Sequence, residues 1–381
     1  MAVCMAAYAL LFIILNNKSK LLYVIMILNI FSTGIDSTWF LMGLEDFKTT
    51  TIRNIAVRLI NVVLILNFVK SQNDLLVYAF IMQFSNALSF IVVLPTVKKY
   101  IIPVKPSYNR IIHHIRKSLI YFIPGIINTI FTSADKTVLG AFANSYEVGV
   151  YEQATKITNL CGSVINSVSN VLLPRVTYLN HNASNESRKF LLKSLGYASL
   201  VSVAVTAGIA CISDEFVPVF FGPSYDKSSV LLKILSVNVL MSVLANYIGQ
   251  QCLVSNNKQR EYNFAIGTGA VINLLMNVLL VNTFQSVGVS LASAFSAIII
   301  FIMVLYFSKQ TIGLRDVIRM TWKSVIAALI MIVIVSMVKT DSFISTIILK
   351  VTLGFFLYLM TLLVLQEKMI LDIVITLKKG G

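Results

Sequence analysis

Residues 148–173 read VGVYEQATKITNLCGSVINSVSNVLL, and polar side chains recur in this apolar stretch at intervals of four and three residues. The recurring residues are Glu152, Lys156, Asn159, Ser163, Asn166 and Asn170. An α-helix places residues with this spacing on one face. In a membrane a central charge costs about 2.5–3.5 kcal/mol on insertion scales, so such a face must contact protein or water rather than lipid.

The composition of the whole chain places this helix in a membrane. The chain has 381 residues, of which 57% are hydrophobic and 12% charged. Soluble domains carry roughly 25% charged residues, so a soluble enzyme and a disordered chain are both excluded. Four scattered cysteines and three histidines provide neither a disulfide framework nor the spacing of a metal site. There is no GxxxxGK[ST] loop and no room for an extramembranous catalytic domain, so we expect no catalytic residues and no metal ligands.

Windows of about 20 apolar residues predict twelve membrane-crossing helices. The predicted spans are roughly 1–15, 21–42, 55–69, 75–94, 118–141, 148–173, 195–212, 229–253, 262–281, 286–307, 322–338 and 343–365. Of the 31 Lys and Arg residues, 21 lie in alternate segments that begin with 43–54 and end with the C-terminal tail, and five lie in the other loops. Because Lys and Arg favour cytoplasmic loops, the C-terminus is predicted to be cytoplasmic.

Segment 96–117 has the highest density of basic residues, with six Lys or Arg residues and two histidines. It is interpreted as a cytoplasmic loop, as a surface helix on anionic headgroups, or as the connector between two structural halves. No nucleic-acid partner is expected, because the net charge of +15 is spread over several short loops.

Polar stripes recur in other spans. Span 118–141 carries them at Tyr121, Gly125, Asn128, Thr132 and Asp135, again four and three residues apart. Shorter stripes occur around Asn29, Ser32 and Asp36, around Asn54, Arg58 and Asn61, around Asn238, Ser242 and Asn246, and around Asn263, Gly267 and Asn277. These stripes have an alternative, purely structural explanation, because small and polar residues also pack membrane helices against one another. Several polar-faced helices in one bundle favour a water-filled chamber, as in transporters.

Five motifs carry a family resemblance, and they are DKTVLG at 135–140, EVGVY at 147–151 followed by Ala154 and Lys156, WFLMGLEDFK at 39–48, LPR at 173–175 and FGPSY at 221–225. They resemble those of the bacterial polysaccharide repeat-unit flippases of O-antigen, capsule and exopolysaccharide. Their order and spacing cover roughly 20–310. The family belongs to the superfamily of multidrug, oligosaccharidyl-lipid and polysaccharide exporters.

The resemblance implies an all-α integral membrane fold with about twelve transmembrane helices, two pseudo-symmetric lobes around a hydrated central cavity and a C-terminal helix pair. The expected parts are an incomplete first lobe of four helices at 1–95, a basic cytoplasmic connector at 96–117, a six-helix second lobe at 118–308, and the helix pair with a cytoplasmic tail at 309–381. The family usually has fourteen helices, so the first two are expected to be missing. A misassigned start, a truncated gene and a functional twelve-helix form remain open.

The resemblance also implies a function, which is to flip polyprenyl-diphosphate-linked oligosaccharides from the cytoplasmic to the outer leaflet of the bacterial cell membrane by alternating access. Expected partners are this lipid-linked oligosaccharide and membrane lipids, with the polysaccharide polymerase and chain-length machinery as further partners. No cofactor is expected apart from a coupling H⁺ or Na⁺. The alternatives are a cation-coupled multidrug antiporter of the same superfamily and a non-functional truncated fragment.

Site residues are predicted from this function. Cations inside the chamber would hold the diphosphate, and the predicted residues are Arg58, Lys136 and Lys156. The predicted sugar-facing wall consists of Asn159, Ser163, Asn166 and Asn170. The predicted ion-coupling acids are Asp36, Asp135 and Glu152, since a membrane acid that changes protonation biases two conformational states. Lys233 and Lys350 are interpreted as snorkelling side chains without a role.

Overall fold

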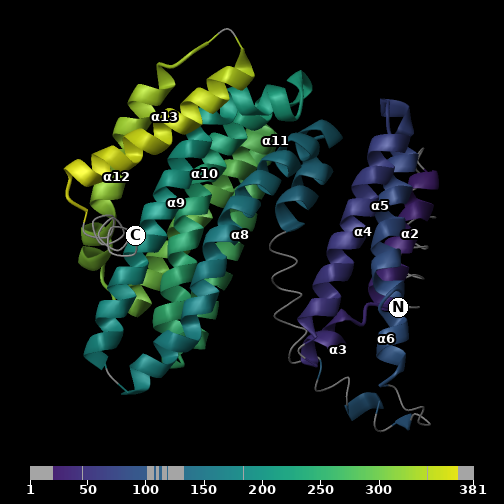
Figure 1. Cartoon of the computed structure of the whole chain (residues 1–381), viewed down its shortest axis with the longest axis horizontal. Helices are drawn as coiled ribbons and strands as arrows, with labels where there is room; N and C mark the ends of the chain where they lie inside the picture. The colour runs from purple at the N-terminus through teal and green to yellow at the C-terminus, as the bar shows by residue number, and fades with distance from the viewer. Residues whose placement is uncertain are drawn as a thin grey trace, which may run out of the picture. The chain divides into compact units, whose positions relative to one another are not determined.

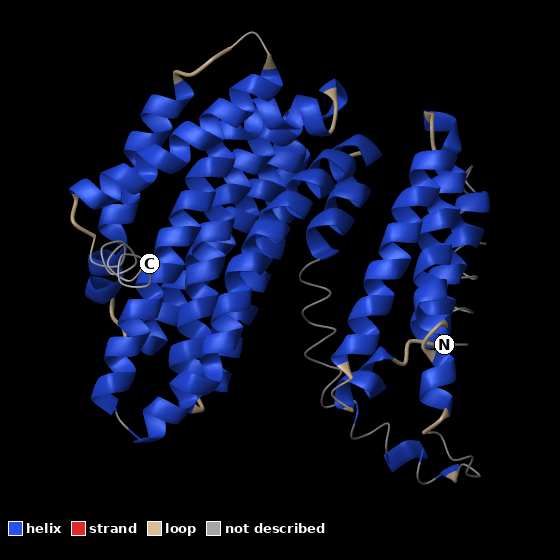
Figure 2. Cartoon of the chain, in the orientation of Figure 1, coloured by secondary structure: helices blue, strands red, loops and turns tan. Residues whose placement is uncertain are grey.

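The computed structural model describes residues 20–44, 46–100, 107–108, 111–113, 118, 133–182, 184–340 and 342–367. All regular secondary structure in these ranges is helical (Figure 2). Eight of the described helices are long and apolar enough to cross a membrane, so the predicted all-α membrane fold is confirmed. The predicted span 1–15 and most of 118–141 lie outside the described residues.

The chain divides into two compact units, Met1–Ile115 and Arg116–Gly381. The predicted division into two lobes, a connector and a terminal pair around a central chamber stays a prediction. In the first unit, α5 packs against both α2 and α4. The helices of this unit are α2 (Lys20–Gly34), α3 (Thr38–Gly43), α4 (Phe47–Phe68), η1 (Gln72–Asp74), α5 (Leu75–Ile91) and α6 (Leu94–Lys98) (Figure 1).

Two boundaries in the first unit differ from the predicted spans. The span predicted at 21–42 is divided between α2 and α3, and the Asp36 carboxylate accepts a hydrogen bond from the Thr38 backbone N–H at 2.8 Å. A side-chain acceptor of this kind stabilises a helix start. The next helix, α4, begins at Phe47 instead of near residue 55. Its first two turns are polar, which lowers their hydropathy, but they contain no Gly or Pro to stop the helix.

The second unit is built around α10, which packs against α8, α9 and α11. The helix pair α12 and α13 packs on α9 (Figure 1). The described elements of this unit are the helical residues 133–142, α8 (Ser145–Asn182), α9 (Ser184–Phe220), η2 (Pro223–Tyr225), α10 (Lys227–Ile248), η3 (Gly249–Leu253), η4 (Val254–Asn256), α11 (Gln259–Ser308), α12 (Leu314–Ser336) and α13 (Phe343–Val364).

Helices of the second unit extend beyond the predicted spans. Segment 174–194 was predicted as a loop, but α8 and α9 continue through most of it, because its basic residues lower hydropathy without breaking a helix. Spans 262–281 and 286–307 join in α11, with a break at Gln285 (φ 49°, ψ −128°). The turn after α9 contains Gly222 at φ 89°, a conformation that favours glycine.

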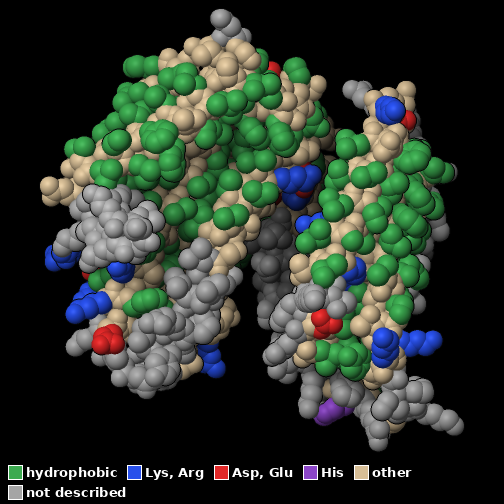
Figure 3. All heavy atoms as spheres, in the orientation of Figure 1, with side chains coloured by type: hydrophobic (Ala, Val, Ile, Leu, Met, Phe, Trp, Pro, Cys, Tyr) green, Lys and Arg blue, Asp and Glu red, His purple; other side chains and the backbone are tan. Residues whose placement is uncertain are grey.

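Exposed and buried side chains differ in kind on these helices. Large apolar side chains remain exposed along these apolar helices (Figure 3). Leu279 and Phe355 are among them. Burying apolar groups gains little in hydrocarbon, so membrane helices associate by close packing and hydrogen bonding. Between α9 and the pair α12–α13, small residues such as Ala207 and Ala327 are buried, and the Tyr358 hydroxyl donates to the Leu200 carbonyl at 2.8 Å.

Helix α10 ends in a single π-helical turn, η3, where it meets α11. A Cβ atom on Gly249 would lie 2.1 Å from Cε2 of the buried Tyr262 ring. That distance is far below van der Waals contact, so only glycine permits this approach of the two helices.

Candidate transport site

A polar cavity of about 340 Å³, here called the second-unit cavity, is lined by residues 133–136, α8, α10 and α11. Its polar lining residues are Ser133, Asp135, Lys136, Tyr151, Thr155, Thr158, Asn159, Asn238, Ser242, Asn273, Ser293 and Ser296. Three of the predicted site residues, Asp135, Lys136 and Asn159, therefore line one cavity.

Glu152 is shared between two lysines at this site. Its Oε2 lies 2.5 Å from Nζ of Lys136, and its Oε1 lies 3.8 Å from Nζ of Lys156 one turn along α8. The Lys156 side chain is 57% exposed, whereas Lys136 is 39% exposed. Of the two lysines, Lys156 is held less tightly by Glu152.

Asp135 accepts three hydrogen bonds from α8 and α11. The donors are the Tyr151 hydroxyl at 2.5 Å, the Asn277 amide at 2.6 Å and the Ser293 hydroxyl at 2.8 Å. The Asn277 amide also donates to Oδ1 of Asn273 at 3.1 Å. Oδ1 of Asn277 is buried and has no hydrogen-bond partner within the described structure. These five residues are called the Asp135 cluster.

Two further residues of the polar stripe on α8, Ser163 and Asn166, do not line the cavity. The Ser163 hydroxyl donates to the Leu160 carbonyl at 2.8 Å. Oδ1 of Asn166 is buried, and it has no hydrogen-bond partner among the described residues. The side chain of Asn170 lies outside the described part of the chain.

Two further predicted residues, Asp36 and Arg58, line a separate cavity of about 440 Å³ within the first unit. This first-unit cavity is also lined by Arg53, Asn54 and Asn61. Arg53 was predicted to lie in a cytoplasmic loop, but it belongs to the second turn of α4.

A buried carboxylate at the start of α8 connects this helix to the start of α10 and to the break in α11. Glu147 accepts hydrogen bonds from Nζ of Lys227 at 2.7 and 2.8 Å, from the Ser286 backbone N–H at 3.2 Å and from the Ser286 hydroxyl at 2.5 Å. Nζ of Lys227 also donates to the Gln285 side chain at 3.3 Å. Sequence analysis assigned no role to this Glu147 cluster (Glu147, Lys227, Gln285 and Ser286), although Glu147 belongs to one of the family motifs.

The Glu147 cluster predicts a pH dependence of stability. Burial alone would raise the pKa of Glu147, but the hydrogen bonds from Lys227 and Ser286 lower it below its ordinary value of 4.5. The stabilisation is therefore complete above pH 4.5 and is lost as the pH falls through the lower pKa of the folded state.

We expect Glu147→Gln to lower the free energy of unfolding by about 1–3 kcal/mol at neutral pH and to flatten its dependence on pH. Unfolding in detergent on both sides of this pH would measure the effect. The exposed Glu186→Gln should match the wild type, and a wild-type-like acid profile in Glu147→Gln would contradict the assignment.

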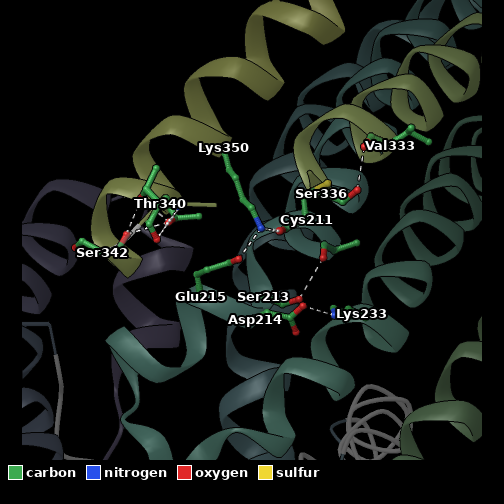
Figure 4. Close-up of polar contacts among 12 residues, drawn as sticks. Cys211, Ser213, Asp214, Glu215, Lys233, Val333, Ser336, Thr340, Ser342 and Lys350 are labelled. Atoms are coloured by element: carbon green, nitrogen blue, oxygen red, sulfur yellow. Dashed lines mark hydrogen bonds and ion pairs between the residues drawn. The ribbon is translucent and has the colours of Figure 1, made fainter. Parts of the chain in front are cut away.

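A second buried ion pair joins α13 to α9 (Figure 4). Nζ of Lys350, whose side chain is 5% exposed, lies 2.6 Å from Oε1 of Glu215 and donates to the Cys211 carbonyl at 3.2 Å. The interpretation of Lys350 as a snorkelling side chain is therefore wrong. The neighbouring Asp214 pairs with Lys233 of α10 at 2.6 Å, but both of these side chains are exposed.

A solved structure shares this fold. The Lipid II flippase MurJ, in an inward closed conformation, matches 92% of this chain with a TM-score of 0.77 and 16% sequence identity, over 75% of the MurJ chain. The chain therefore has the fold of a multi-helical membrane transporter.

Sequence comparisons define the relationship further. Residues 1–180 match the family described as polysaccharide biosynthesis protein. A putative O-antigen transporter of Escherichia coli (strain K12) is 24% identical over 66% of this chain and 61% of its own length. One from Shigella dysenteriae is 21% identical over 74% of this chain and 71% of its own length. The probable low-salt glycan biosynthesis flippase Agl15 of Haloferax volcanii is 24% identical over 50% of this chain and 41% of its own length. The chain is thus similar to proteins named as O-antigen transporters and glycan flippases, in agreement with the resemblance of its motifs.

Proposed function

We propose that this protein moves polyprenyl-diphosphate-linked oligosaccharides from the cytoplasmic to the outer leaflet for surface polysaccharide export. The second-unit cavity is the observation that carries the proposal. Sugar and phosphate groups do not cross hydrocarbon unaided, and a polar, charged cavity among membrane helices offers them a hydrated environment. The named functions of the relatives, O-antigen transport and glycan flipping, support the same substrate class.

Lys136, which lines this cavity, and Lys156, which shares Glu152 with it, are the proposed contacts for the diphosphate. Because Lys156 lies 3.8 Å from Glu152, it exchanges the carboxylate for a phosphate oxygen more readily than Lys136, which lies at 2.5 Å. Asn159 lines the cavity and is a proposed sugar contact. Ser163, Asn166 and Asn170 would continue this sugar-facing wall along α8.

Alternating access requires two conformations of similar free energy, each open to one side of the membrane. The lipid tail stays in the bilayer while the polar headgroup moves through the protein. The C-terminus is proposed to be cytoplasmic, as the loop charges indicate. A polysaccharide polymerase and chain-length machinery would use the exported repeat units.

The Asp135 cluster is the proposed site of the coupling ion, Na⁺ or H⁺. Carboxylate, amide and hydroxyl oxygens are the ligands that hard cations prefer. The unpartnered Oδ1 of Asn277 is one oxygen available to a cation, while a proton would bind Asp135 itself. Glu152 and Asp36 are further candidates for coupling.

Removing the charge of Lys156 tests its role. We expect Lys156→Ala to abolish translocation while the protein level is unchanged, because the exposed end of this side chain contributes substrate binding and little packing. Surface polysaccharide and protein level in the membrane would be measured together. Lys339→Ala, in an exposed turn, serves as the charge-matched control. Full surface polysaccharide in Lys156→Ala would exclude the role.

A clean gene deletion complemented by this 381-residue chain tests the function itself. We expect the deletion to trap lipid-linked repeat units in the cytoplasmic leaflet and the chain to restore their export. If surface polysaccharide persists after deletion and drug tolerance changes instead, the flippase assignment is wrong and the protein is assigned as a multidrug antiporter.

A further inference from the structure

One face of α12 carries two arginines followed by a continuous row of apolar side chains. Its residues recur at intervals of four and three, which places them on one side of the helix, and all of them are exposed. In chain order they are Arg315, Arg319, Trp322, Ile326, Leu329 and Val333. The opposite side of α12 is buried against α9 and α13. The six exposed residues are called the open α12 face.

The length of α12 places the two arginines at the edge of the hydrocarbon. The helix has 23 residues and is about 35 Å long, against about 30 Å for the hydrocarbon core of a bilayer. Arg315 and Arg319 lie in its first two turns, within about 8 Å of the helix end. Trp322 follows one turn deeper, and tryptophan favours the boundary between headgroups and acyl chains. The apolar row beyond it lies at the depth of the acyl chains.

Carboxylates near the start of α12 are paired with other cations. Asp316, next to Arg315 in the chain, pairs with Arg188 of α9 at 3.1 Å. Glu367, which follows α13, lies 3.4 Å from a lysine of α12. Neither Arg315 nor Arg319 forms an ion pair with another residue that the structure describes. Both guanidinium groups are therefore exposed and open to an anion from outside the chain.

We propose that the open α12 face binds an anionic phospholipid, with Arg315 and Arg319 at its phosphate group and an acyl chain along the apolar row. Guanidinium donates to phosphate oxygens in a bidentate geometry, and the Trp322 indole N–H is a further donor at headgroup depth. A zwitterionic headgroup carries its own cation, so two arginines favour a lipid with net negative charge. The site belongs to the leaflet that the loop charges predict to be cytoplasmic.

Fluorescence of Trp322 tests the site directly. The chain has two tryptophans, so Trp39→Phe leaves Trp322 as the single emitter. The full chain would be reconstituted in phosphatidylcholine bilayers that contain either brominated phosphatidylglycerol or brominated phosphatidylcholine, because bromine quenches a tryptophan that it contacts. We expect a preference of about tenfold for the brominated phosphatidylglycerol.

Variants of the two arginines assign the preference to this face. Arg315→Gln and Arg319→Gln should each reduce it to about threefold, and the double variant should remove it. Arg315→Lys combined with Arg319→Lys keeps both charges and should keep most of the preference. Lys339→Gln, an exposed lysine beyond the other end of α12, should behave as the parent Trp39→Phe chain does.

Three results would overturn the proposal. They are equal quenching by the two brominated lipids, an unchanged preference in the double glutamine variant, and displacement of brominated phosphatidylglycerol by inorganic phosphate, which would identify a soluble anion as the ligand. Because both arginines are exposed and form no ion pair with a described residue, we expect these variants to fold. The measurement requires no transport, so its result is independent of the proposed function.

Discussion

Lys350→Ala is expected to destabilise the protein by about 3–5 kcal/mol, because it leaves the Glu215 carboxylate buried among membrane helices without its cation. Oε2 of Glu215 already has no hydrogen-bond partner in the described structure, so the loss of Lys350 would leave the whole carboxylate uncompensated. Denaturant unfolding in detergent would measure the change.

The adjacent acid on α9 provides the control. Lys233→Ala removes the partner of Asp214, at the same 2.6 Å separation but with both side chains exposed, and should cost no more than about 1 kcal/mol. Replacing the buried pair with Lys350→Met and Glu215→Leu together should recover most of the stability. Equal losses for Lys350→Ala and Lys233→Ala would show that burial does not strengthen the pair.

Asp135→Asn is expected to abolish ion-coupled translocation while the protein remains folded. The change keeps the size of the side chain but removes the charge that receives three hydrogen bonds and is the proposed ligand of the coupling ion. Transport of lipid-linked oligosaccharide in proteoliposomes, with a Na⁺ gradient and a H⁺ gradient imposed separately, would measure it.

Asp214→Asn is the matched control, because the same chemical change there affects an exposed ion pair outside the second-unit cavity. It should transport as the wild type does under both gradients. Retention of gradient-dependent transport in Asp135→Asn would exclude Asp135 as the coupling site and favour Glu152 or Asp36.

Helical periodicity predicted the features of the candidate site that lie within a single helix. Glu152 and Lys156, which their spacing placed on one helix face, lie one turn apart on α8 and form an ion pair at 3.8 Å. Hydropathy likewise predicted the membrane helices. It misplaced the start of α4, and thereby Arg53, because polar residues in the first turns of a membrane helix resemble a loop when only hydropathy is read.

Contacts between distant helices could not be predicted from a single sequence. The Asp135 cluster forms only when α8 and α11 pack together, which brings Tyr151, Asn273 and Ser293 to Asp135 or to one another. The periodicity of a single helix gives no information on how far apart two helices lie. Lys350 was interpreted as a snorkelling side chain for the same reason, since its pairing with Glu215 depends on how α13 packs against α9. The stripe of Asn263, Gly267 and Asn277 predicted a polar face on α11, and Asn273 lies one turn before Asn277.

The close approach of the Tyr262 ring to Gly249 constrains which residues related proteins can carry at these two positions. The Tyr262 ring fills the space that a side chain at 249 would need, so a Cβ atom there requires the ring or the helices to move. A relative that carries alanine at the position of Gly249 must carry a smaller side chain at the position of Tyr262, or separate the two helices. The two positions should therefore covary across relatives, with a bulky ring tolerated only opposite glycine.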